Sequence, residues 1–261
     1  MPLPIQRYIS NELTHFVGRS LDTKDQYSVL QDIISSGFLS HPPHDKRIVG
    51  NLVVNPEAKL SENEMFLPQV VCFCDIPIED LPIHIRKYGP FGLSFEKEFI
   101  VQHGGAPAFY IPYFARVKSE WGYPPEMMNK ASSSDELQEL AKGFNKADYF
   151  DWMVKFYLEF FDQIEDRICE AKIGSDFPYN IHEVVELQRF INFHILSYTK
   201  FFNHDLPDDH NDNYYFEREW RIIGNLNFEL DDISRVIIPK SFAKSFKIDQ
   251  PNYYGQITFS D

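Results

Sequence analysis

The sequence predicts an α+β protein with a strand-rich, mixed-sheet core that is interrupted by a helical insertion. Short apolar runs rich in β-branched and aromatic residues, bounded by Gly and Pro, occur near both ends of the chain. Between them the strand signals vanish and helical periodicity takes over. We therefore expect a core domain formed by residues 1–119 and 205–261, with a helical insertion at 120–204.

In the first part of the chain, predicted strands alternate with helices. A helix from Lys24 to Gly37 carries an apolar stripe at helical spacing, with Asp22 as its N-cap and Gly37 as its C-cap. A second short helix is expected at 78–88, and residues 41–68 form a long loop. The strands that we expect here span residues 14–17, 52–54, 70–76, 92–99 and 107–113.

The insertion and the C-terminal part differ sharply in pattern. Helical spacing covers residues 133–144, 149 to about 173, and 181 to about 202. The second of these helices carries an apolar stripe that we interpret as core, formed by Phe150, Met153, Val154, Phe156, Tyr157, Phe160, Phe161 and Ile164. The last strands are expected at 214–223, 234–238 and 255–259.

The strand predicted at 214–223 carries an unusual charge pattern. Side chains alternate between the two faces of a strand, so Glu217, Glu219 and Arg221 should project from one face. Buried charges are costly unless they are paired or used. Two hypotheses follow: the three residues form a structural ion-pair network, or they serve catalysis or binding.

Composition excludes several classes of protein. The net charge of −14 argues against non-specific binding of nucleic acid, which needs clustered Lys and Arg, and it suits a basic protein partner. Cys72, Cys74 and Cys169 are too few for a disulfide framework, and we interpret Cys72 and Cys74 as reduced thiols of the core. No run of apolar residues has the length of a signal peptide or a membrane span, which predicts a cytoplasmic protein.

Local signatures of most enzyme classes are missing from the sequence. There is no G-x-G-x-x-G, no phosphate-binding P-loop and no G-x-S-x-G elbow. Two polar clusters, at 41–45 and 205–212, contain His and Asp, but neither has the ligand spacing of a metal centre, so no metal site is predicted.

Several segments together resemble the bacterial abortive-infection (AbiGi-type) phage-resistance family, which is described as an antitoxin. The segments that carry the resemblance, in order, are Thr14–Phe16, Val71–Pro77, Lys87–Phe95, Pro107–Tyr113 and Glu217–Arg221. The resemblance implies a role in phage defence and a cognate protein partner that the chain neutralises by binding.

A second resemblance concerns chemistry. A His on a first strand, a Tyr after a middle strand and a Glu on a late strand are similar to ADP-ribosyltransferase folds, which have a split sheet. This resemblance implies that His15 and Tyr88 hold NAD, and that Glu219, with Glu217, is the catalytic carboxylate. The Ser-Thr-Ser segment of the arginine-modifying branch is missing. An enzyme with NAD as its ligand and a non-enzymatic binding module therefore remain alternatives.

Overall fold

A computed structural model describes residues 10–41, 44, 47, 50–116, 125–170, 181–207, 210 and 213–261. The contacts within the chain divide it into two units. Unit 1 comprises Met1–Asn51, Gln69–Ala108 and Asp208–Asp261, and unit 2 comprises Leu52–Pro68 and Phe109–Pro207. In the described part of the chain, no helix is long and apolar enough to cross a membrane.

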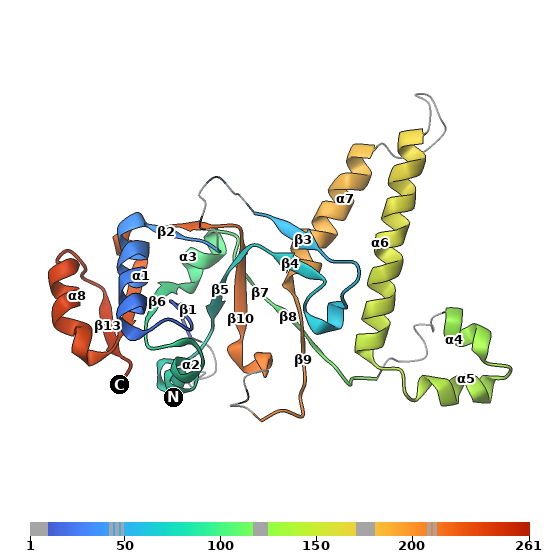
Figure 1. Ribbon diagram of the computed structural model, residues 1–261, viewed down its shortest axis with the longest axis horizontal. Helices are drawn as coiled ribbons and strands as arrows, with labels where there is room; N and C mark the ends of the chain where they lie inside the picture. Colours follow the sequence, from blue (N-terminus) through green and yellow to red (C-terminus); the bar gives the residue numbers. More distant parts are fainter. Residues whose placement is uncertain are drawn as a thin grey trace, which may run out of the picture. The chain divides into compact units, whose positions relative to one another are not determined.

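Unit 1 is built on a seven-stranded mixed sheet with the order β13-β12-β6-β1-β5-β10-β7 (Figure 1). The strands are β1 (Glu12–Phe16), β5 (Val70–Cys74), β6 (Gly92–Glu96), β7 (Ala106–Pro107), β10 (Glu219–Ile223), β12 (Ile233–Ile238) and β13 (Gln256–Phe259). Within this sheet β12 and β13 pair in parallel, and the other neighbours pair antiparallel. This confirms the predicted α+β class with a strand-rich, mixed-sheet core.

Helices and short turns complete unit 1. The helices are α1 (Thr23–Ser36), α2 (Leu81–Tyr88), α3 (Lys97–Gln102) and α8 (Ala243–Asp249); the 3-10 turns are η2 (Ile78–Asp80), η5 (Tyr214–Glu217), η6 (Leu230–Asp232) and η7 (Lys240–Phe242); and β2 (Phe38–Leu39) pairs with β11 (Leu226–Asn227). Both predicted caps of α1 are confirmed: Asp22 accepts from the backbone N–H of Lys24, and Gly37 is left-handed with φ +59°. Leu30 of α1 and Phe246 of α8 lie in the core with Leu13, Phe73 and Phe95 of the sheet.

Unit 2 is mostly helical. Its elements are β3 (Leu52–Val54), η1 (Leu60–Glu62), β4 (Phe66–Pro68), β8 (Phe109–Pro112), α4 (Pro125–Lys130), α5 (Ser134–Ala141), α6 (Lys146–Glu170), α7 (Ile181–His194), η4 (Leu196–Tyr198) and β9 (Thr199–Phe202). β3 and β4 form an antiparallel pair, and β8 pairs with β9 in parallel. Met65, Phe66, Val154 and Phe201 are central to the core of this unit.

Several predictions about these elements are wrong. The loop expected at 41–68 contains η1 and β4, and the strand expected at 107–113 is divided into β7 and β8, which belong to different sheets. The strand expected at 214–223 begins only at Glu219, because the chain first forms η5 and then turns at Arg218, whose φ is +42°. Residues 199–202, expected in a helix, form β9, because they pair with β8. The strand expected at 92–99 ends at Glu96, where α3 begins.

The apolar stripe of α6 is core only in part. Val154 and Phe161 are buried, as predicted. Phe156 and Phe160 are exposed by 53 % and 47 %, so their assignment to the core is wrong. Helical spacing identifies residues that share a stripe, but it does not say how wide a part of that stripe the neighbouring elements cover.

Candidate functional site

The register of the central strands gives the large sheet of unit 1 one polar face. Thr14 of β1 is paired with Cys74 of β5, and Cys74 is paired in turn with Glu219 of β10. Residues directly opposite each other share a face, so these three side chains lie on the same side. Ser94 of β6 continues the row, with its hydroxyl 2.8 Å from that of Thr14. We call this side the polar face; Leu13 and Phe73, one residue along, project from the other side into the core.

Glu219 and Arg221 form a buried ion pair on the polar face. They lie two residues apart on β10, so their side chains share a face. The Arg221 Nε donates to Glu219 Oε1 at 2.7 Å, and only 12 % and 6 % of the two side chains are exposed. Glu219 and Arg221 therefore form an ion pair, as the first of the two hypotheses expects for these two residues.

Glu217 has a different environment from the predicted one. Because the chain turns at Arg218, Glu217 belongs to η5 and does not project from β10 beside Glu219. Its Oε1 accepts from Lys87 Nζ at 2.6 Å and also from the Tyr88 hydroxyl, both in the last turn of α2. The prediction that Glu217, Glu219 and Arg221 share one strand face is therefore wrong.

Tyr88 links the two carboxylates electrostatically. Burial raises the pKa of its hydroxyl well above the usual range, and the negative charge of Glu217, with smaller contributions from Cys74 and Glu219, raises it further. Tyr88 is therefore a protonated hydrogen-bond donor. Its ring stacks on that of Phe16, with centroids 5.6 Å apart, so the end of α2 lies over the polar face.

A glycine fixes the position of Tyr88 at the end of α2. Gly89 ends the helix with φ +106°, a conformation that L side chains rarely adopt. A Cβ at this position would lie 2.5 Å from Nε2 of Gln26, which donates to the Gly18 carbonyl. The glycine therefore lets the backbone after Tyr88 pass close to the Gln26 side chain.

His84 is a residue of this site that sequence reasoning did not assign. It precedes Tyr88 by one helical turn, and its ring stacks on those of Tyr88 and Phe16 at 6.3 and 6.4 Å. Only 5 % of it is exposed, and its buried Nδ1 has no hydrogen-bond partner among the described residues. Burial lowers the pKa of the imidazole to about 4, although the charge of Glu217 opposes the shift. The four-residue spacing to Tyr88 was the signal that could have identified it.

His15 lies apart from the other predicted site residues. It follows Thr14 on β1, so its side chain leaves the strand on the face opposite Thr14 and Glu219. Its Nδ1 donates to the Cys72 carbonyl at 2.8 Å, and its ring meets the edge of Phe73. Burial lowers the pKa of the imidazole, opposed by the hydrogen bond to Cys72. The structure brings Tyr88 together with Glu217, places Glu219 within the same electrostatic environment, and does not add His15 to them.

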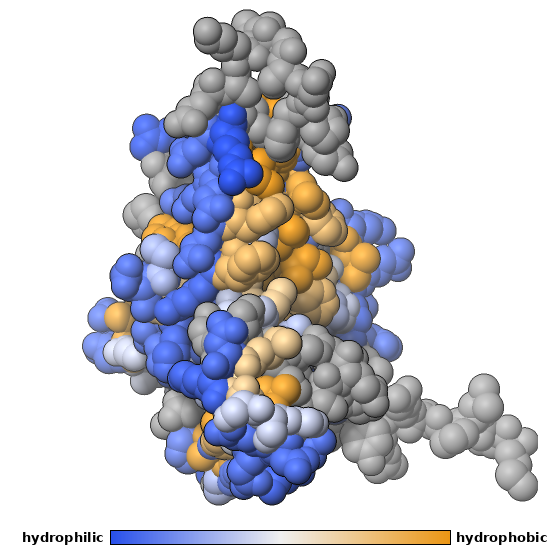
Figure 2. All heavy atoms as spheres, turned by 90° about the vertical axis from the view of Figure 1, so that its right-hand side faces the viewer, coloured by the Kyte–Doolittle hydropathy of each residue, from blue (hydrophilic) through white to orange (hydrophobic). Residues whose placement is uncertain are grey.

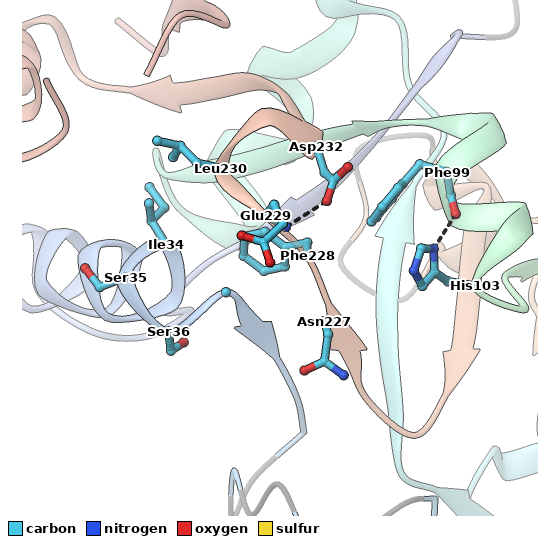
Figure 3. Close-up of a pocket in the computed structure, with 11 residues that line it drawn as sticks. Ile34, Ser35, Ser36, Phe99, His103, Asn227, Phe228, Glu229, Leu230 and Asp232 are labelled. Atoms are coloured by element: carbon cyan, nitrogen blue, oxygen red, sulfur yellow. Dashed lines mark hydrogen bonds between the residues drawn. The ribbon is translucent and has the colours of Figure 1, made fainter. Parts of the chain in front are cut away.

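A cavity of about 580 Å³ lies elsewhere in unit 1, between the C-terminal ends of α1 and α3 and the β11–η6 segment (Figure 3). None of the four predicted site residues lines it. Its polar groups serve local structure: His103 Nδ1 donates to the Phe99 carbonyl, and Asp232 accepts from the backbone N–H of Glu229. The polar face beneath α2 therefore remains the candidate site.

Comparison with known proteins identifies the family. A family model described as "Putative abortive phage resistance protein AbiGi, antitoxin" matches residues 60–257, most of the 261-residue chain. The match includes Tyr88, Glu217 and Glu219 and begins after His15. No curated protein and no solved structure matches the chain. The resemblance to ADP-ribosyltransferases stays a prediction, whereas the AbiGi-type resemblance is confirmed. The chain belongs to the AbiGi family of abortive-infection phage-resistance antitoxins.

Proposed function

We propose that the protein acts in abortive infection as a non-enzymatic antitoxin that neutralises a cognate toxin by binding it. The observation that carries the proposal is the pairing of both carboxylates of the Glu-x-Glu segment. Glu219 is held by Arg221, and Glu217 is held by Lys87 and Tyr88. This is the arrangement expected of a structural ion-pair network.

The energetics of the two pairs support a structural role. Removing one partner of a buried ion pair leaves an uncompensated charge, which typically costs about 3–5 kcal/mol. A carboxylate that served as a base or charge stabiliser would have to leave its partner or act while still neutralised by it. Both requirements are harder for Glu219 to meet than for Glu217, because its partner Arg221 projects from the same strand and is itself only 12 % exposed.

The charge of the chain favours a basic partner. A net charge of −14 attracts positively charged proteins, accelerates their association and disfavours acidic surfaces. The negative net charge of the chain therefore favours a toxin with a basic surface as the partner.

Co-expression tests the proposal. The wild-type chain should rescue the growth of cells that express the cognate toxin, and the two purified proteins should co-elute in size-exclusion chromatography. Glu219→Gln leaves the buried Arg221 without its carboxylate and should lower stability, but the variant that remains folded should still bind the toxin and rescue growth. The proposal fails if the purified proteins form no complex, or if Glu219→Gln abolishes rescue while the melting temperature and toxin binding are unchanged.

A second candidate is an ADP-ribosyltransferase-like activity on NAD. The common environment of Tyr88, Glu217 and Glu219 favours it, as does the buried, unpartnered Nδ1 of the neighbouring His84. In this candidate Glu219 would stabilise the positive charge that develops on the nicotinamide-bearing ribose. The residues fit only in part, because His15 leaves β1 on the opposite face.

Labelled NAD separates the two candidates. The enzyme candidate predicts nicotinamide release by the wild-type chain and its loss in Glu219→Gln, measured by chromatography of the products. A wild-type chain that neither binds nor consumes NAD excludes this candidate and leaves the binding antitoxin.

A further inference from the structure

Helix α6 carries a ladder of aromatic side chains along its solvent-exposed side. Trp152, Phe156 and Phe160 follow one another at intervals of four residues, so they lie on one face of the helix. Their rings stack in sequence, with centroids 6.3 and 6.2 Å apart. Phe156 is 53 % exposed and Phe160 is 47 % exposed, although burial of an aromatic ring is among the largest apolar gains available.

Helix α7 continues this apolar surface. Leu187 and Phe190 are 53 % and 54 % exposed. The Tyr157 hydroxyl of α6 donates to the Gln188 carbonyl of α7 at 3.3 Å. The part of α6 that carries Phe156 and Phe160 therefore lies next to the part of α7 that carries Leu187 and Phe190. Figure 2 shows an apolar patch, bordered by hydrophilic residues, in this part of unit 2. We call Trp152, Phe156, Phe160, Leu187 and Phe190 the aromatic patch.

The aromatic patch is larger than scattered surface apolar residues would produce. If each of its four most exposed members presents about half of its side chain, the patch offers roughly 400 Å² of apolar surface. Contiguous patches of that size on soluble proteins commonly mark interaction sites. None of these residues belongs to the core cluster of unit 2, whereas Val154, Phe161 and Val184 of the same two helices are buried.

The charges around the aromatic patch indicate which kind of protein surface would bind there. Helix α6 contains seven acidic and three basic residues, and the exposed Glu159 follows Phe156 by three residues, on the same side of the helix. A second copy of this chain would bring two acidic helices together, which opposes self-association. An apolar surface rimmed by Lys and Arg would gain both apolar burial and charge complementarity.

We propose that the aromatic patch is the docking surface for the cognate toxin, and that the toxin meets it with an apolar surface rimmed by basic residues. The assignment rests on the proposed antitoxin function and specifies where that function resides. Phe156 and Phe160 are the apolar anchors of the interface, and Glu159 belongs to its electrostatic rim.

Calorimetric titration of the purified full-length chain with the purified toxin tests this assignment. The toxin used is the one against which the chain protects cells in co-expression. Phe156→Ser/Phe160→Ser should weaken binding by about 30-fold or more, as expected for central anchors. Glu159→Lys should weaken it by about threefold at low salt and flatten its salt dependence, because exposed rim charges act through screened attraction. Glu159 is exposed, so this second variant tests the patch even if the first variant fails to fold.

The matched control is Ile248→Ser, which removes a 68 % exposed apolar side chain of α8 in unit 1. It should leave the affinity within about twofold of the wild type. If the wild-type chain binds the toxin and both patch variants bind as well as Ile248→Ser, the patch assignment is overturned while the antitoxin function stands. If the wild-type chain does not bind, the proposed function itself fails. Sedimentation that shows a wild-type dimer, lost in Phe156→Ser/Phe160→Ser, would assign the patch to a second copy instead.

Discussion

The polar face of unit 1 and the aromatic patch of unit 2 differ in solvent exposure: charged side chains are buried on the first, and apolar side chains are exposed on the second. On the polar face of unit 1, Glu219 and Arg221 are nearly inaccessible to solvent and neutralise one another. On α6 of unit 2, Phe156 and Phe160 expose about half of their surface. Buried charge that is satisfied internally serves the fold, whereas exposed aromatic surface that the fold leaves uncovered is available to a partner. The two roles should therefore be separable by mutation.

Breaking the buried pair should give the largest effect on stability. Arg221→Met leaves the Glu219 carboxylate buried without its cation, which should lower the free energy of unfolding by about 3–5 kcal/mol. Urea denaturation followed by circular dichroism measures the change. Adding Glu219→Gln to Arg221→Met removes the stranded charge and should recover a good part of the loss. Equal stabilities of the single and double variants would mean that the pair does not control the fold of the polar face.

His84 should make unit 1 sensitive to mild acid. Its pKa is lowered to about 4 in the folded protein, against the ordinary value of 6.5, so the unfolded chain takes up the proton first. Stability is then present above pH 6.5 and is lost as the pH falls toward 4, by up to roughly 3 kcal/mol. His84→Gln should flatten this part of the stability–pH curve, measured by urea midpoints between pH 4 and 7. An unchanged slope in the variant would assign the acid sensitivity to other groups.

Two glycines of unit 1 should differ in how much stability is lost when each is replaced by alanine. Gly37 and Gly104 both have positive φ, but a Cβ at Gly37 would lie 2.5 Å from the Phe228 carbonyl oxygen, whereas one at Gly104 meets nothing within 4 Å. Gly104→Ala should cost about 1 kcal/mol from backbone strain alone. Gly37→Ala should cost about 2 kcal/mol or more, because the backbone must also move. Thermal unfolding of the two variants checks the order, and equal losses would contradict the clash.

The aromatic patch should give the smallest effect on stability. Phe156→Ser/Phe160→Ser removes two half-exposed rings and their mutual stacking, so the free energy of unfolding should change by no more than about 1 kcal/mol. Denaturant midpoints of the variant and the wild type provide the measurement. A loss as large as that of Arg221→Met would show that these rings serve the fold, and it would remove the contrast between the two units.

The sequence predicted those parts of the fold whose signals are local. The caps Asp22 and Gly37 bracket α1 because a carboxylate at the start and a left-handed glycine at the end act on the helix itself. The domain boundaries at 119 and 205 stay a prediction. The contacts of the folded chain group residues 52–68 with the helices of unit 2, because Leu60 of η1 and Phe66 of β4 pack in one core with Val154 of α6. This packing joins residues that are far apart in the sequence, so it has no local signal.

The candidate site was harder to predict because it depends on register and on one backbone conformation. Non-Gly residues rarely adopt positive φ, so nothing in the sequence marks Arg218 as the turn that precedes the strand. That turn moves Glu217 away from the face of Glu219 and toward Lys87. The opposite placement of His15 follows from pairing partners, and a shift of one residue in pairing would reverse it.

The hydrogen bond of His15 has a mechanical consequence for the large sheet. β1 and β5 share a single register pair, whereas β1 with β6 and β5 with β10 share five each. The imidazole binds the Cys72 carbonyl where the ladder between β1 and β5 lacks further pairs. The junction between β1 and β5 therefore has one register pair and the His15 hydrogen bond, fewer than the ladders on either side of it. Opening along this junction breaks fewer hydrogen bonds than opening either adjoining ladder, so slow amide exchange should divide the sheet between β1 and β5.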